Sequence, residues 1–220
     1  MSWLGWLTAA AVVVGYAVGR HLARQLSELG YRLDTEDATP PPRAPWIVAP
    51  AVAATWGLVV WHLGERHGGV DLPAYLLLAT VGVALARIDA DVHRLPSGLT
   101  YPTAVAVSGL LVVSSALSGQ WSALLQAAVA TVLAAVVYLL LALVSRGQFG
   151  WGDVILGVIL SGALGYLSPL APWLALLLAF VGASVVAIAG MVTRRLTLRS
   201  RIAFGPYLLA GALVAALVTG

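Results

Sequence analysis

The sequence contains no cysteine and no lysine, and only 10% of its 220 residues are charged. Without cysteine the chain cannot form disulfides, thiolate nucleophiles, cysteine-ligated zinc sites or iron–sulfur clusters. A soluble domain is typically about a quarter charged, whereas 60% of this chain is hydrophobic, so a water-soluble globular domain is excluded. The same composition excludes intrinsic disorder. All twelve basic residues are arginines scattered between apolar runs, so no nucleic-acid partner is predicted.

Long apolar runs make up most of the chain. Most are close to the about 20 residues that a helix needs to cross a bilayer. Continuous Leu, Ala and Val runs favour helices over the alternating strands of a membrane barrel. We therefore predict an all-α polytopic membrane protein with about eight transmembrane helices, at residues 3–19, 46–63, 72–88, 99–117, 121–144, 154–170, 171–192 and 202–218.

The placement of the arginines predicts the orientation of these helices. Arginine and lysine are concentrated in the loops that face the cytoplasm. Eleven of the twelve arginines lie in or beside the first, third, fifth and seventh loops, and only Arg66 lies in an even-numbered loop. The odd-numbered loops are therefore expected in the cytoplasm, and both termini outside.

The first loop is the only long one. Four leucines between residues 22 and 33 recur at helical spacing, so the first helix is expected to continue as an amphipathic stretch. Three consecutive prolines at 40–42 then stop any helix, and we interpret this part as a solvated connector. This divides the chain into residues 1–45, the first helix with its cytoplasmic loop, and residues 46–220, a helical bundle.

Three aspartates stand apart from the other acidic residues, which lie in the first two loops where solvation is expected. Asp89 and Asp91 end the third predicted helix, and Asp153 opens the sixth. Carboxylates at membrane depth are costly and usually face a bundle interior or an aqueous cavity. Under the predicted topology Asp89 and Asp153 lie at the same cytoplasmic end, so they can meet if their helices are neighbours. The alternative interpretation is an interfacial charge beside an arginine at each position.

Two such carboxyl groups can share a proton and catalyse hydrolysis, because one activates water while the other polarises a carbonyl. The glycines of Gly150-Trp151-Gly152-Asp153 also allow a substrate strand to approach the backbone closely. Asp153 begins a helix, where the dipole favours an anion, and Asp89 ends one, where the dipole disfavours it. We therefore expect Asp153 to be the ionised base and Asp89 its protonated partner, in a pair that titrates jointly.

Three motifs, in this order, resemble those of the type IV prepilin peptidases. They are Ile88-Asp89 with Leu95-Pro96, then Gly150-Trp151-Gly152-Asp153-Val154, then Ala203-Phe204-Gly205-Pro206-Tyr207-Leu208. The resemblance covers about residues 46–220. It implies an aspartyl endopeptidase of the plasma (inner) membrane that removes the short basic leader of prepilin-like proteins at the cytoplasmic face, in type IV pilus assembly or protein secretion.

The resemblance also assigns roles to single residues. It implies that Asp89 and Asp153 are the catalytic pair. Support from the motif backbone is expected at Gly150, Gly152, Pro96, Gly205 and Pro206. Pro206 suits a first helical turn, and Gly205 allows close packing near the site. The chain departs from the family pattern at Ile155, Ser97 and Ala203, where members often have lysine, an acidic or amide residue, and proline.

The missing cysteines bear on a second activity of the family. Many members carry a four-cysteine zinc insert between their first two helices and also methylate the new N-terminus. This chain has no cysteine, so it resembles the streamlined members that lack the insert. We therefore do not expect N-methyltransferase activity, and no cofactor is implied.

Asp91 and His93 are the remaining polar candidates near the first motif. Asp91 is two residues from Asp89, so a helix points it elsewhere. We expect it to support the site or face solvent, and it is the alternative first catalytic acid. His93 lies four residues after Asp89 and would tune that acid if the helix continued, although Pro96 argues against continuation. A cluster at the second loop, His62, Glu65 and His67, favours a solvated rim, so no metal is predicted.

Two other functions stay open. In a proton-coupled transporter Asp89 and Asp153 would act as relay groups, and such acids should lie near the bilayer midplane. In an inactive membrane scaffold derived from the peptidases, they would have no chemical role. Besides prepilin-like substrates the expected partners are membrane lipids; the sequence leaves open which prepilin is cleaved and whether the chain forms a homo-oligomer.

Overall fold

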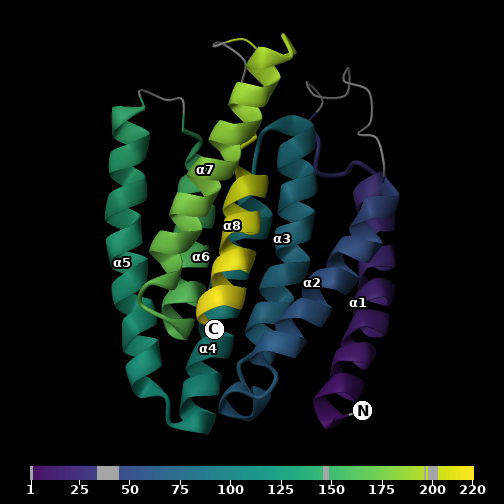
Figure 1. Ribbon diagram of the computed structural model, residues 1–220, viewed down its shortest axis with the longest axis vertical. Coiled ribbons are helices and arrows are strands. Elements are labelled where there is room, and N and C mark those ends of the chain that lie inside the picture. The colour runs from purple at the N-terminus through teal and green to yellow at the C-terminus, as the bar shows by residue number, and fades with distance from the viewer. Residues whose placement is uncertain (1, 34–44, 146–148, 196, 198–202) are drawn as a thin grey trace.

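The computed structural model describes residues 2–33, 45–145, 149–195, 197 and 203–220. These residues form eight α-helices and two short 3₁₀ helices, η2 (Pro45–Ile47) and η3 (Arg66–Gly69), and they contain no strand (Figure 1). The α-helices are α1 (Trp3–Ser27), α2 (Val48–Leu63), α3 (Leu72–Val92), α4 (Ser97–Ser118), α5 (Trp121–Val144), α6 (Trp151–Leu167), α7 (Ala171–Val192) and α8 (Gly205–Thr219). The all-α prediction is confirmed.

Successive helices run antiparallel, so the chain passes up and down through the bundle (Figure 1). Helices α1, α3, α5 and α7 end at the top of this view, where α2, α4, α6 and α8 begin. The N- and C-termini both lie toward the bottom. The end of α3 and the beginning of α6 therefore share one end of the bundle.

Five helices, α1, α3, α4, α5 and α7, are long and apolar enough to cross a membrane. Helices α2, α6 and α8 are apolar but shorter, about 22–26 Å at a rise of 1.5 Å per residue, against a hydrocarbon core of about 30 Å. The outer faces of α5 and α7 expose leucine, valine and isoleucine, among them Leu143 and Ile188. Such faces suit lipid rather than water, and the chain is a multi-pass membrane protein.

The first helix extends beyond its predicted span, and its end differs from the prediction. Helix α1 runs without interruption to Ser27, but Leu29 then adopts a left-handed conformation with φ 55°. This conformation cannot continue a right-handed helix, so Leu29 and Leu33 lie beyond the helix on which their spacing placed them. Helix α1 packs along α2. The prolines at 40–42 lie outside the described residues.

Helix α6 is central to the bundle, because it packs against α4, α5, α7 and α8. Glycines let α5 approach it closely. A Cβ atom on Gly157 would lie 2.3 Å from Cζ of Tyr138, and one on Gly165 would lie 2.4 Å from Cβ of Ala130. Because α6 carries Asp153 in its first turn, this packing fixes the position of one candidate catalytic residue along the axis of the bundle.

We expect Gly157→Val to destabilise the bundle by about 1–3 kcal/mol or more, since the new side chain would overlap the buried Tyr138 ring. The measurement is thermal unfolding of the purified protein in one detergent. Gly109→Val is the matched control, because a Cβ there meets nothing within 4 Å. Equal unfolding temperatures for the two variants would contradict the close α5–α6 packing.

Candidate active site

The first two sequence motifs come together at a cavity of about 320 Å³ at the end of the bundle where α3 ends and α6 begins. The end of α3, the turn that follows it, and the first turns of α4 and α6 supply the lining. The lining residues are Asp89, His93, Arg94, Leu95, Ser97, Thr100, Tyr101, Gly150, Trp151, Gly152, Asp153 and Ile155. Both aspartates of the predicted pair therefore face one space.

Asp89 lies in the last turn of α3, and only 4% of it is exposed. The backbone N–H of Gly205 donates a hydrogen bond of 2.9 Å to its Oδ2. Gly205 begins α8, so the N-terminus of this helix, where the dipole favours negative charge, meets the carboxyl group. A Cβ at Gly205 would lie 2.8 Å from Oδ2, so the approach requires glycine. The sequence predicted close packing here but not the hydrogen bond.

Asp153 lies in the first turn of α6 and is half-buried. Its Oδ1 is buried and has no hydrogen-bond partner among the residues that the structure describes. Its Oδ2 lies beside Gly150, where a Cβ would come within 3.0 Å of it. Asp153 and Asp89 interact electrostatically across the shared cavity. An oxygen without a partner at a cavity wall is available to a substrate or a water molecule.

The two helices that carry the aspartates, α3 and α6, are joined mainly through α4 and α8 rather than by close packing against each other. The hydroxyl of Tyr75 in α3 donates a hydrogen bond of 2.8 Å to the carbonyl oxygen of Ala163 in α6. Helices α4 and α8 each pack against both α3 and α6. The Tyr75 hydrogen bond joins the beginning of α3 to the end of α6, at the end of the bundle opposite the cavity, whereas α4 and α8 bridge the two helices along their length.

The turn after α3 brings the first motif against the second. Helix α3 ends at Val92, and His93 adopts a left-handed conformation with φ 51° while its N–H donates to the carbonyl oxygen of Asp89. The helix therefore does not continue toward Pro96, which caps α4 instead. Leu95 packs on Gly152, where a Cβ would lie 2.8 Å from Cβ of Leu95.

His93 and Asp91, the two other polar candidates, lie on different sides of this turn. His93 is exposed, lines the cavity and interacts electrostatically with Asp89 even though the helix has ended. Asp91 is not part of the cavity lining. Its carboxylate accepts hydrogen bonds from Tyr31 and Arg32, in the segment after α1. No sequence pattern predicted this contact, because Tyr31 and Arg32 belong to no motif and lie in the stretch expected to continue the first helix.

The expectation that the acids of the second loop are solvated holds only in part. Glu65 is exposed, but Asp71, directly before α3, is fully buried. Asp71 therefore lies inside the bundle rather than in solvent, near Tyr75 of α3. No three metal-ligating side chains gather within the described part of the chain. The side chain of His67 lies outside it, and His62 is exposed.

Comparison with known proteins adds an independent observation. The sequence model of the type IV leader peptidase family matches residues 76–192. The matched segment contains Asp89, Pro96 and Gly150-Trp151-Gly152-Asp153, and it stops before Gly205. No curated protein and no solved structure matches the chain. Because the match covers more than half of its length, the chain belongs to the type IV leader peptidase family.

Proposed function

We propose that the protein is a membrane aspartyl endopeptidase that removes the short basic leader of prepilin-like proteins. The observation that carries this proposal is that Asp89 and Asp153, from two separate motifs, line one cavity. Membership of the type IV leader peptidase family supports aspartic-type chemistry at this site. The cavity lies at a helix end rather than at mid-depth of the bundle, which favours a peptidase over a transporter with a midplane relay.

The proposed hydrolysis uses both carboxyl groups. One carboxylate takes a proton from water while the water oxygen bonds to the scissile carbonyl carbon, and the other, protonated, gives its proton to the carbonyl oxygen. The C–N bond then breaks, the leaving nitrogen takes the proton held by the first group, and the second group recovers its own. One water is consumed per bond cleaved.

The assignment of the shared proton to Asp89 rather than to Asp153 stays a prediction. The helix ends favour an ionised Asp153. Gly205, however, gives Asp89 a backbone donor, whereas Oδ1 of Asp153 has no partner among the described residues. Because the two groups interact, the proton belongs to the pair.

The same proposal places all eight helices across the plasma (inner) membrane, with the cavity at the cytoplasmic face and both termini outside. Its support is the arginine distribution together with the antiparallel order of the helices. The arginine-rich odd-numbered connections follow α1, α3, α5 and α7, whose ends lie at the cavity end of the bundle (Figure 1). The divide between residues 1–45 and a peptidase bundle at 46–220 also stays a prediction.

Cleavage by the purified protein tests the proposed function. The protein is mixed in detergent with prepilin-like small proteins from its own genome, and the products are analysed by mass spectrometry. We expect a single cut that separates the basic leader from the rest of at least one of these proteins. If a folded preparation leaves every candidate intact, the peptidase proposal is wrong, and the transporter or scaffold interpretation takes its place.

The cleavage rate should fall at both acid and alkaline pH. The active state holds one proton across Asp89 and Asp153, so acid removes the base and alkali removes the acid. The profile is measured as kcat against pH, with circular dichroism confirming the fold at each point. A profile without an acid limb would contradict a pair that shares one proton.

A further inference from the structure

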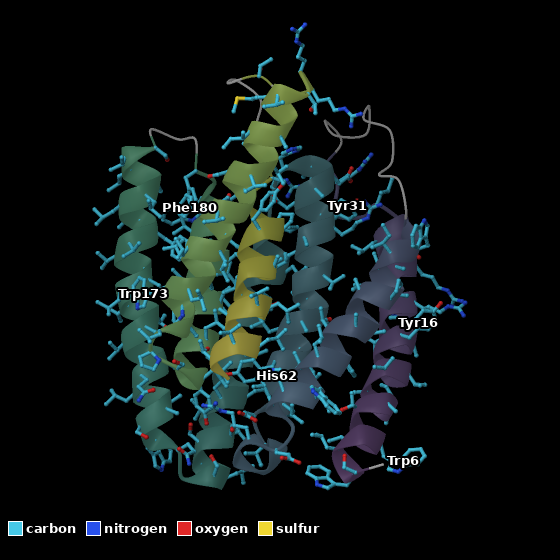
Figure 2. All side chains as sticks on the ribbon, in the orientation of Figure 1. Trp6, Tyr16, Tyr31, His62, Trp173 and Phe180 are labelled. Carbon is cyan, nitrogen blue, oxygen red and sulfur yellow. The ribbon has the colours of Figure 1, made fainter. Side chains whose placement is uncertain are left out.

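The turn after α3 is held by residues that lie just beyond α1. The hydroxyl of Tyr31 donates a hydrogen bond of 2.6 Å to Oδ2 of Asp91. Arg32 donates from Nε to Oδ2 at 2.9 Å and from Nη2 to Oδ1 at 2.6 Å. In return, Arg94 donates from Nη2 to the backbone oxygen of Tyr31 at 2.9 Å. These four residues, Tyr31, Arg32, Asp91 and Arg94, are called the clasp below; Figure 2 shows Tyr31 between α1 and α3.

The contacts of the clasp are directional and shielded from water. The side chains of Arg32 and Asp91 are only 3% and 4% exposed. A guanidinium that binds both oxygens of a carboxylate fixes its orientation as well as its distance. Burial, together with the hydrogen bond to Asp91, raises the pKa of Tyr31 to about 12. The phenol therefore stays protonated and remains a donor throughout the neutral pH range.

Two residues of the clasp lie on either side of a strained residue in the turn after α3. Asp91 and Arg94 flank His93, whose left-handed backbone is costly for a residue other than glycine and persists only where the surroundings impose it. His93 and Arg94 themselves line the catalytic cavity. The next residue, Leu95, packs on Gly152, one residue before Asp153. A direct chain of contacts thus joins the segment after α1 to the second catalytic motif.

We propose that the clasp is a positioning device for the active site. By holding Asp91 and Arg94, Tyr31 and Arg32 fix the turn after α3 and, through Leu95, its distance from the beginning of α6. Asp91 is then a positioning residue rather than the first catalytic acid. The segment after α1 belongs functionally to the peptidase, although the predicted domain boundary separates them. The catalytic part of this inference rests on the proposed function.

Kinetics of leader cleavage give the first test. We expect Arg32→Gln and Asp91→Asn each to lower kcat by about ten- to a hundred-fold, because a displacement of about 1 Å at the reacting groups has such an effect, and to leave KM nearly unchanged. Arg32→Lys should lie between Arg32→Gln and the natural protein. The exchange Arg32→Asp with Asp91→Arg should restore much of the activity. Arg24→Gln, an exposed arginine in the last turn of α1, is the control and should match the natural protein.

Three kinetic outcomes would overturn the proposal. If Asp91→Asn is inactive while Arg32→Gln is fully active, Asp91 is catalytic. If both are fully active, the clasp does not position the site. If neither the exchange nor Arg32→Lys recovers activity, the contacts serve stability alone.

A second readout does not depend on peptidase activity. Leu95→Cys introduces the only thiol of the chain, at a buried position. Its reaction with a maleimide should be slow, several-fold faster when Arg32→Gln or Asp91→Asn is added, and unchanged by Arg24→Gln. If the natural protein cleaves nothing but labelling responds in this way, the proposed function fails and the clasp stands. Unchanged labelling in all backgrounds would refute the clasp whatever the activity.

Discussion

Asp89→Asn and Asp153→Asn are each expected to lower kcat of leader cleavage by roughly three orders of magnitude. Asparagine has nearly the same size as aspartate, so the side chain at position 89 can still accept a hydrogen bond from the Gly205 N–H. An amide, however, can neither take nor give the proton that hydrolysis moves. The measurement is kcat for the purified variants on one prepilin-like substrate, with circular dichroism and gel filtration confirming that each variant is folded.

The activity of the double variant shows whether the two aspartates act in one shared step or independently of each other. Because both acids act on one transition state, Asp89→Asn with Asp153→Asn should be no slower than the slower single variant. Asp91→Asn should keep measurably more activity than either. A double variant whose loss equals the product of the single losses would contradict a pair that acts as a unit.

Gly205→Ala is expected to lower kcat by about a hundred-fold. The new Cβ would lie 2.8 Å from Oδ2 and 3.3 Å from Cγ of Asp89, so either the carboxyl group or the beginning of α8 must move, and the hydrogen bond from the Gly205 N–H is lost. KM should change little, because Gly205 is not among the cavity-lining residues.

The matched control for Gly205→Ala is Gly109→Ala, since its added methyl group meets nothing within 4 Å. Gly109→Ala should retain the full kcat and at least the original stability, because alanine is the better helix former. If Gly205→Ala is as active as this control, the N-terminus of α8 does not support Asp89. The role of the third motif would then be limited to folding.

The fold could be predicted from the sequence because the thickness of the bilayer sets the length of each apolar run. The runs at 121–144 and 171–192 coincide with α5 and α7. Helix α6 begins at Trp151 rather than at 154, because Asp153 joins its first turn instead of preceding it. Hydropathy places the start of a helix at the first residue of an apolar run, whereas the helical backbone starts directly after the N-cap residue.

The candidate pair could be predicted because charge is rare in this chain, so an aspartate at a helix end stands out. The Gly205 hydrogen bond could not, since it depends on how closely the beginning of α8 approaches α3. The same holds for the clasp. Tyr31 and Arg32 belong to no motif and lie where the leucine spacing indicated only an amphipathic helix, and Asp91 meets them only because the end of α3 lies beside the segment that follows α1. Contacts between a loop and a distant helix leave no local pattern.

The central claim is that Asp89 and Asp153 together hydrolyse a prepilin leader. Its most direct test is the mass of one prepilin-like protein recovered from membranes in which it is co-expressed with the natural chain, Asp89→Asn, Asp153→Asn or Asp91→Asn. We predict complete leader loss with the natural chain, none with Asp89→Asn or Asp153→Asn, and partial loss with Asp91→Asn. Leader loss that persists in Asp89→Asn but disappears in Asp91→Asn would contradict the assignment.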